Sequence, residues 1–317
     1  MSTLTTPHID VHRGGDRMKT RVSWLDSKHS FSFGEHYDPD NTHHGLLLVN
    51  NEDVVAPGQG FETHPHRDME IVTWVLTGSL VHQDSLGHSG VIYPGLAQRM
   101  SAGTGILHSE KNDSWHMSGA PAHDEPVHFV QMWVVPDESG RTPGYQQLEI
   151  DDQLAAGALV TVASGLPRYR DRTAIAIASS HSAFHVARMG SGGVDSATGA
   201  VELAGGGTGL IIGGVESTTG GVDSTAAGMN SVEAVADSAT GAPSAAGRGR
   251  SIAEVIELPD APYLHLFVAR GEVEMEGVGA LYEGDAVRLT RSGGQRIRAR
   301  RPSEILVWEM HARLGAQ

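Results

Sequence analysis

Cysteine is absent from the 317-residue chain, which excludes disulfides, thiolate metal ligands and cysteine nucleophiles together. No apolar run approaches the roughly 18–20 residues that a membrane helix requires, and the N-terminal residues lack the apolar centre of a signal peptide. Basic side chains are few, since 23 Lys and Arg stand against 38 Asp and Glu, a formal net charge of −15. Nucleic-acid binding needs clustered cations. We therefore predict a cytoplasmic protein that binds neither membranes nor nucleic acids directly.

Histidine, in contrast, is abundant. The chain has 18 histidines, nearly as many as Lys and Arg together, and most of them fall in the first 150 residues. The length allows one large or two ordinary domains, and a hydrophobic fraction of 39% is enough for a folded core. We expect a folded protein whose chemistry uses imidazole.

Residues 190–250 differ in composition from the rest of the chain. They are rich in Gly, Ala, Ser, Thr and Val, and the pattern of residues 192–199 recurs at residues 213–220. The repeats are irregularly spaced and hold few large apolar residues, so their packing would not offset the entropy lost on ordering. We interpret this block as a disordered insertion in a loop, with a Gly-rich adhesive or calcium-binding repeat as the alternative.

Elsewhere the hydrophobic period is two residues, which is the period of a β-strand. Residues 70–82 predict a strand, a turn at Thr77-Gly78 and a second strand. Helical periodicity is confined to residues 151–156. Short strands at intervals of about 8–12 residues indicate an all-β barrel or sandwich. The other strand-like segments are residues 127–135, 263–269, 271–276, 285–290 and 305–309.

Two short motifs carry residues that could hold a metal. The first contains His64 and His66, and the second contains His108 and Glu110. On a strand, side chains at positions i and i+2 point to the same face. If the two segments face each other across a barrel, three imidazoles and one carboxylate converge, a set that suits a divalent transition metal. Glu70 is an alternative carboxylate ligand, which we rank below Glu110.

The remaining histidines of the first half have other expected roles. His128 lies on a predicted strand, where it is either a partner of a metal ligand or a packed ring. Those in polar, loop-like stretches are expected to be exposed, namely His43, His44, His82, His88, His116 and His123.

Three segments resemble the pirin family of the cupin superfamily: residues 31–39, 63–70 and 99–110. The resemblance is dense through residues 20–148 and looser beyond, although residues 263–286 are similar to the C-terminal pirin barrel. It implies an all-β bicupin, with two cupin-type β-barrels in tandem over residues 1–150 and 151–317. The block at about 190–250 departs from the usual pirin barrel and is expected as an insertion in the second one.

The resemblance also implies a metal site and an activity. The family's ligands fall on His64, His66, His108 and Glu110, in the N-terminal barrel alone. One divalent transition metal per chain is expected, Fe(II) first, with Ni, Cu, Mn or Zn as alternatives. Bacterial pirins are associated with quercetin 2,3-dioxygenase activity, in which the metal binds a flavonol through its 3-hydroxyl and dioxygen cleaves the central ring, releasing carbon monoxide.

This activity assigns roles to further side chains. Glu110 would act as the catalytic base, because a ligand with a free oxygen can accept the hydroxyl proton. The expected partners are a flavonol-like aromatic molecule and dioxygen, bound by a monomer. Trp133 is a candidate to line the pocket, but packing in the barrel core is the preferred interpretation. Candidates for substrate binding are Phe61, Arg67 and Met69.

A non-enzymatic function is the alternative. Pirins also act as iron-dependent regulators that bind partner proteins, so the chain could be a redox sensor acting through protein–protein contacts. A purely structural or sugar-binding barrel would leave the four converging ligands without a purpose.

Overall fold

The computed structural model describes residues 7–113, 124–155, 157–190 and 253–315, which belong to one compact unit. The strands up to residue 150 are β1 (His8–His12), β2 (Met18–Arg21), β3 (Leu25–His29), β4 (Leu47–Val55), β5 (Gly60–His66), β6 (Glu70–Thr77), β7 (Leu80–Asp84), β8 (Ser89–Ile92), β9 (Leu96–Ser101), β10 (Ile106–Lys111), β11 (Val127–Val134) and β12 (Gly144–Glu149). The later elements are α1 (Asp151–Leu154), β13 (Val160–Ser164), β14 (Ile175–Ala176), β15 (Ser182–Met189), β16 (Val255–Glu257), β17 (Tyr263–Arg270), β18 (Glu272–Met275), β19 (Gly279–Tyr282), β20 (Ala286–Thr290), β21 (Arg296–Ala299) and β22 (Ser303–Met310). Two short 3₁₀ helices, Gly14–Asp16 and Pro167–Tyr169, complete them. The predicted all-β class is confirmed.

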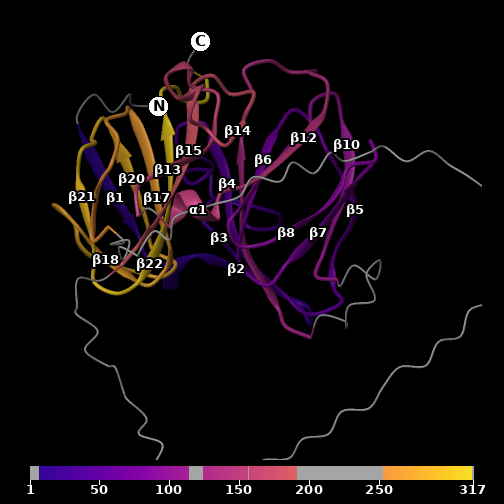
Figure 1. The fold of residues 1–317 in the computed structure, drawn as a ribbon, viewed down its shortest axis with the longest axis horizontal. Helices are drawn as coiled ribbons and strands as arrows, with labels where there is room; N and C mark the ends of the chain where they lie inside the picture. Colours follow the sequence, from indigo (N-terminus) through magenta and orange to yellow (C-terminus); the bar gives the residue numbers. More distant parts are fainter. Residues whose placement is uncertain (1–6, 114–123, 156, 191–252, 316–317) are drawn as a thin grey trace, which may run out of the picture. The chain divides into compact units, whose positions relative to one another are not determined.

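The first barrel is built from two sheets (Figure 1). Among the described residues, a seven-stranded sheet has the order β12-β9-β6-β11-β4-β3-β2 and a four-stranded sheet has the order β5-β10-β7-β8. Apolar side chains from both sheets meet inside, among them Val75 and Phe129 from the larger sheet and Leu80 and Ile92 from the smaller one. The two-residue period explains this core, since alternate side chains of each strand point inward.

The second barrel repeats this plan. Its seven-stranded sheet runs β1-β20-β17-β22-β15-β13-β14 and its four-stranded sheet runs β16-β21-β18-β19 within the described part of the chain. The indigo strand β1 lies beside the yellow and orange strands because it pairs antiparallel with β20 (Figure 1). Two cupin-type barrels in tandem are therefore confirmed as the fold.

A large apolar cluster joins the two seven-stranded sheets. It contains Trp74 of β6 together with Phe184 of β15 and Trp308 of β22, all essentially without solvent exposure. The indole Nε1 of Trp74 also donates a hydrogen bond to Glu304 of β22. The central strands of each seven-stranded sheet are therefore buried on both faces. One face lines the interior of its own barrel, and the other packs against the second seven-stranded sheet.

The expected strand–turn–strand over residues 70–82 is present as β6 and β7, but the turn carries the chain from one sheet to the other. Gly78 has a φ of +73°, and a Cβ there would lie 2.9 Å from the carbonyl oxygen of Pro126. Glycine is therefore required at this turn. The expected insertion over residues 190–250 falls, apart from Gly190, outside the described residues. No helix among those described is long and apolar enough to cross a membrane.

Candidate metal centre

Neighbouring strands bring three histidines together. β5 and β10 pair antiparallel, with His64 opposite His108 and His66 opposite Ile106. Alternation then places the three imidazoles on one side of the four-stranded sheet. Their ring centroids lie 4.9 Å apart for His64–His66, 4.4 Å for His64–His108 and 4.8 Å for His66–His108. The convergence expected from the two motifs is present for these residues, here called the histidine trio.

The hydrogen bonds of the trio leave nitrogen lone pairs free for a cation. Nδ1 of His64 lies 2.7 Å from the carbonyl oxygen of Glu62, so it must donate its proton there and leave Nε2 bare. That Nε2 is 3.0 Å from Nε2 of His108, and either a proton or a cation must lie between them. Nε2 of His66 is buried without a hydrogen-bond partner among the described residues. The trio fits a divalent transition metal.

Electrostatics favour the neutral imidazoles that such an ion requires. Burial, and then the neighbouring His108 and His64, lowers the pKa of His66 to about 4. Burial, and then His64 and His82, lowers the pKa of His108 to about 3. At neutral pH both rings are uncharged without any ion to displace their protons.

Glu110 lies beside the trio but forms its own contacts. The register of β10 against β5 shifts between His108 and Glu110, and the side chain is buried. Gln131 of β11 donates from Nε2 to both carboxylate oxygens, at 2.9 and 2.8 Å. The ligand atoms of the trio lie within 4.8 Å of one another, whereas Glu110 belongs to a second such group with His108 and His82. His108 is common to the two groups.

Glu70, the alternative carboxylate, lies in neither group. It is buried at the start of β6, where it accepts hydrogen bonds from Ser101 Oγ at 2.9 Å and from the backbone N–H of Ala178 at 3.1 Å. Ala178 follows β14, a strand of the second barrel's sheet. The Glu70 carboxylate therefore links the two barrels.

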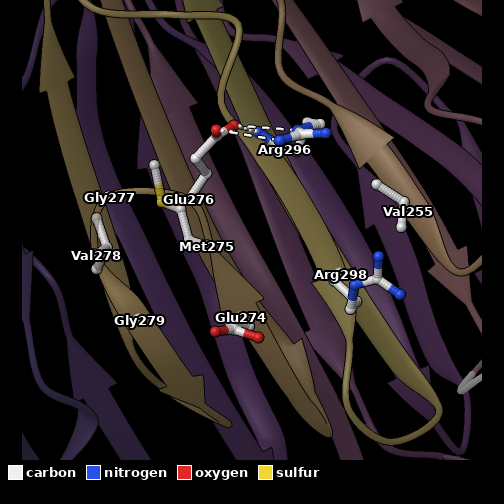
Figure 2. A pocket seen from close by; sticks show the side chains of 9 residues that line it. All are labelled: Val255, Glu274, Met275, Glu276, Gly277, Val278, Gly279, Arg296 and Arg298. Carbon is white, nitrogen blue, oxygen red and sulfur yellow. Dashed lines mark hydrogen bonds and ion pairs between the residues drawn. The ribbon is translucent and has the colours of Figure 1, made fainter.

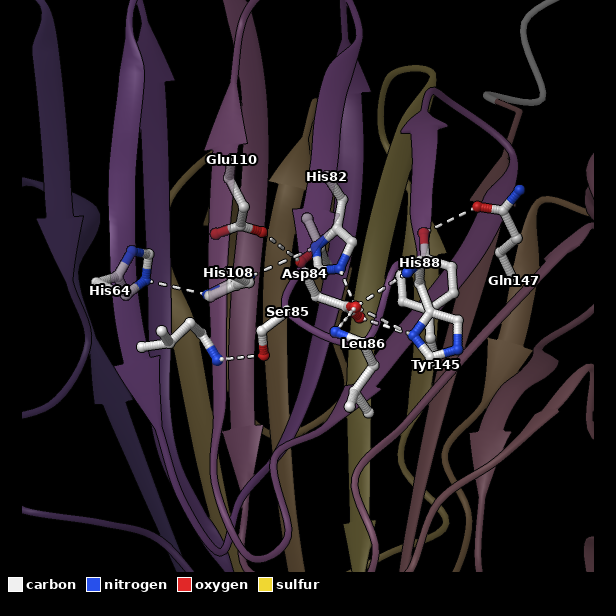
Figure 3. A network of polar contacts seen from close by, with 12 residues as sticks. His64, His82, Asp84, Ser85, Leu86, His88, His108, Glu110, Tyr145 and Gln147 are labelled. Carbon is white, nitrogen blue, oxygen red and sulfur yellow. Dashed lines mark hydrogen bonds and ion pairs between the residues drawn. The ribbon is translucent and has the colours of Figure 1, made fainter.

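The expectation that His82 is exposed is wrong. The residue lies on β7 and is fully buried, with its Nδ1 3.4 Å from Nδ1 of His108 and its Nε2 3.5 Å from Asp84 (Figure 3). Asp84 also accepts a hydrogen bond from His88 at 2.9 Å. A proton on Nδ1 of His108, donated to His82, would leave Nε2 of His108 free to face the rest of the trio. Leu80, His82 and Asp84 alternate along β7 and share one face of it, but this alternation alone did not indicate that the face points inward.

Other histidines also differ from expectation. His43, His44 and His88 are partly buried rather than exposed, and His44 Nε2 contacts the carbonyl oxygen of Leu289 at 3.2 Å. His128 pairs through Nε2 with Glu52 at 2.9 Å, not with the trio. His116 and His123 lie outside the described residues.

Comparison with known proteins places the chain in a family. The model of the family described as Pirin matches residues 12–134. A protein of Mycobacterium tuberculosis (strain H37Rv) named "Putative quercetin 2,3-dioxygenase" is 48% identical over 310 residues, which cover 98% of each chain. The chain belongs to the pirin family. The "Quercetin 2,3-dioxygenase" of Escherichia coli K12 is 46% identical to this pirin over 143 residues, 45% of this chain and 58% of the other.

Solved structures agree with the family assignment. YhhW from Escherichia coli has a TM-score of 0.67 and 28% identity, covering 96% of this pirin and 97% of the other chain. A second structure, described as bacterial pirin YhhW in complex with nickel(II), has a TM-score of 0.67 and 27% identity, covering 96% and 100%. A quercetin 2,3-dioxygenase from Acinetobacter baumannii shares the fold, with a TM-score of 0.59 at 20% identity over 96% of this chain and 86% of that one.

A cavity of about 590 Å³ opens beside the trio, between the sheets of this pirin's first barrel. Its lining includes His64, His66, Glu110, Gln131, Phe33, Phe61, Trp133, Asn51 and Asp53. Of the candidate substrate contacts, Phe61 lines the cavity. Met69 packs instead against the cluster of Ile71 and Met100. Arg67 is exposed and lines a separate shallow depression beside Leu107.

Two residues that line the cavity, Trp133 and Gln131, were not assigned to it by the sequence analysis. For Trp133 the lower-ranked alternative is the correct one: the residue is partly buried and lines the cavity, with its ring centroid 4.8 Å from that of His66. Its Nε1 donates to Oε1 of Gln131 at 3.0 Å. Gln131 thus connects Trp133 to Glu110, although nothing in the sequence around it marked a functional residue.

Proposed function

We propose that this pirin is a metal-dependent dioxygenase that cleaves flavonols such as quercetin with dioxygen and releases carbon monoxide. The observation that carries the proposal is the histidine trio, two of whose members line a cavity with aromatic walls that a buried carboxylate also lines. The names of the relatives support the same reaction. We propose His64, His66, His108 and Glu110 as the ligands.

The metal proposed is a single divalent transition ion per chain. Fe(II) remains our first candidate, with Ni, Cu, Mn or Zn as alternatives, and the nickel bound by the YhhW relative supports an imidazole-rich site of this kind. When bound, such an ion supplies Lewis acidity that lowers the pKa of a coordinated hydroxyl and holds the reactants in adjacent positions.

The protein's own residues perform the remaining steps. Glu110 accepts the proton of the flavonol 3-hydroxyl, and Gln131 holds the carboxylate in place through both oxygens. Phe61 and Trp133 form apolar walls that hold the flat substrate and exclude water. Because Met69 and Arg67 lie away from the cavity, the proposal gives them no direct contact with the substrate.

The test is turnover of quercetin by protein loaded separately with Fe(II), Ni(II), Cu(II), Mn(II) and Zn(II). We expect at least one metal form to lose flavonol absorbance in air and release carbon monoxide, with neither change under nitrogen. Metal analysis should give one ion per chain. Absence of carbon monoxide from every form would favour the non-enzymatic, iron-dependent regulator with a protein partner.

The ligand set has its own test. The double variant His64→Ala/His66→Ala should lose the metal, and two tightly bound metals in the unmodified protein would contradict a single site. A monomer, a cytoplasmic location and a domain boundary near residue 150 stay predictions.

A further inference from the structure

A row of polar side chains crosses the interior of the first barrel. Strand register sets His29 of β3 opposite Asn51 of β4, and Asn51 opposite Gln131 of β11. The row continues to Thr73 of β6 and Gln98 of β9. Small barrels usually fill such positions with apolar side chains, and polar groups taken from water cost free energy unless they are hydrogen-bonded. The row therefore indicates a function for this interior surface.

Only the middle of the row is explained by the metal centre. There Gln131 and Thr73 donate to Glu110. At the cavity end, Asn51 and its same-face neighbour Asp53 are each 5% exposed. Oδ1 of both side chains is buried without a hydrogen-bond partner in the described residues, and both residues line the cavity. These two residues are here called the polar floor. A ligand with hydrogen-bond donors would satisfy it.

The walls of the cavity define the rest of that ligand. Phe33, Phe61 and Trp133 present aromatic rings, and Phe33 meets Trp133 edge to face with centroids 5.6 Å apart. Aromatic walls favour a flat apolar ring system. Acceptors on the floor favour hydroxyl groups carried by that ring system.

We propose that the polar floor, Asn51 and Asp53, binds phenolic hydroxyl groups of the substrate other than the hydroxyl at the metal centre. This inference rests on the proposed function and adds its specificity: the pirin selects polyhydroxylated flavonols over those that carry the 3-hydroxyl alone. Sites built to bind a hydroxyl reject an analogue that lacks it, because the site's buried polar groups are then left unpaired.

The environment of Asp53 suits this role. Burial raises the pKa of Asp53 to about 7; a hydrogen bond with Ser27 opposes this shift, and the nearby charge of Glu110 adds to it to a smaller extent. Near neutral pH the side chain therefore exists in both forms. The carboxylate accepts a hydrogen bond from a phenol and the carboxylic acid can also donate one.

The polar floor differs from another depression of the molecule, one of about 460 Å³ on β18 and β21 (Figure 2). Both of its carboxylates lie at the surface and form ion pairs with arginines. Glu276 lies 3.2 Å from Arg296, and Glu274 pairs with Arg300. Such pairs leave no unsatisfied buried group for a ligand, whereas the floor has two.

The experiment compares the binding of quercetin with that of 3-hydroxyflavone, which keeps the 3-hydroxyl and lacks the other hydroxyls. Zn(II)-loaded protein is titrated without oxygen, and quenching of tryptophan fluorescence gives each Kd. We expect the unmodified protein to prefer quercetin by about 10- to 100-fold, the range for a hydrogen bond to a charged group. Asp53→Ala should abolish most of this preference by weakening quercetin binding, with less than about a threefold change for 3-hydroxyflavone.

Two further variants make the result specific. Asp53→Asn keeps an acceptor oxygen, so it should retain part of the preference and guards against a folding defect in Asp53→Ala. Gln98→Ala removes a buried member of the same row that does not line the cavity, and it should leave the preference unchanged.

An equal ratio of the two Kd values in the unmodified protein and in Asp53→Ala overturns the inference, even if turnover survives. The proposed function fails separately, if binding shows the expected preference while no metal form consumes quercetin.

Discussion

Gln131 fixes the orientation of Glu110, because one amide nitrogen contacts both carboxylate oxygens. That contact matters at the scale of single residues, since the proposed function requires this carboxylate to bind a metal and accept a proton, and both roles need a fixed orientation. Thr73 adds a longer contact of 3.4 Å to the same carboxylate. Substitution of the carboxylate therefore tests ligand and base together.

Glu110→Gln is expected to weaken metal binding, because a neutral amide is a poorer ligand for a divalent ion and turns an N–H group toward Gln131. Turnover per bound metal should fall further, by about 10²–10⁴-fold, the usual contribution of general-base catalysis. Metal content and carbon monoxide release, measured on the same sample, separate the two effects.

Glu70→Gln is the matched control. Glu70 accepts from Ser101 and Ala178 and lies outside both metal-ligand groups, so turnover per metal should survive. The opposite outcome in the two variants would assign the catalytic carboxylate to Glu70.

His82 supplies a second prediction for single residues. A metal-binding histidine usually donates its other ring N–H to a partner, and loss of that partner costs about 10–100-fold in metal affinity. His82→Phe keeps a ring to stack on Tyr145, which lies 4.7 Å away, but removes the hydrogen bond to His108. We expect the metal Kd, from competition with a chelator, to rise by that factor.

His88→Phe is the control for His82, because His88 contacts Asp84 and not His108. Its metal Kd should change by less than about threefold. Equal losses in the two variants would show that His82 acts through general packing of the barrel and not through His108.

At the scale of strands, the approach of β5 to β10 determines where Glu110 lies relative to the trio. A Cβ on Gly60 would lie 2.3 Å from the carbonyl oxygen of Glu110. Gly60→Ala should therefore push the strands apart, lowering the free energy of unfolding by about 1–3 kcal/mol, as overpacking does. It should also weaken metal binding. Urea unfolding of metal-free protein and a metal titration measure the two effects.

Gly58→Ala serves as the comparison, since a Cβ there meets nothing within 4 Å although φ is +68°. The left-handed backbone costs about 1–2 kcal/mol with alanine, and metal affinity should stay the same. If Gly60→Ala leaves metal affinity equally unchanged, the spacing of these strands does not control the site.

Strand periodicity explains which parts of the site were predictable. His64, His66 and His108 follow the two-residue alternation of single strands, so their common face can be derived from sequence alone. The choice between Glu110 and Glu70 depends on which strand neighbours which. Glu110 meets Gln131 across two different sheets, and a single sequence does not encode sheet order directly.

His82 and Trp133 show why the remainder was not predictable. Alternation separates the two faces of a strand, but it does not say which face points inward when the inner face is polar. His82 lies on the same face of β7 as Asp84, and the charge of Asp84 predicts that this face is exposed. The structure instead buries His82 completely. The large size of Trp133 favoured a place in the core. The cavity that it lines is formed together with residues of the other sheet, so it could not be inferred from the sequence of one strand. The β class and the strand segments followed from periodicity without such information, whereas the tandem barrels followed from the resemblance to pirins.

For the molecule as a whole, buried histidines link stability to pH. His265 of β17 is fully buried, and both ring nitrogens lack a hydrogen-bond partner among the described residues. Burial, and then Arg288, holds its pKa well below the ordinary value of 6.5. As pH falls below 6.5, the imidazole of the unfolded chain binds a proton, whereas that of the folded protein does not. The free energy of unfolding therefore decreases as pH falls.

His265→Phe should remove this part of the acid sensitivity. The full effect approaches about 1.4 kcal/mol per pH unit, or about 2 kcal/mol between pH 6.5 and 5. Urea unfolding of metal-free protein at pH 7.5 and pH 5 should therefore show a smaller loss of stability for the variant. Parallel losses in both proteins would mean that His265 is protonated in the folded state or does not contribute.

The pairing of β1 with β20 has a consequence for folding during synthesis on the ribosome. Residues 8–12 are synthesised more than 270 residues before residues 286–290, their partners. Until that later segment has been made, β1 lacks the β20 partner that it has in the described structure. Contacts between such distant segments slow folding, and an unpaired edge invites association with another chain. In the nascent pirin, β1 therefore stays open to such association until β20 has been made and can pair with it.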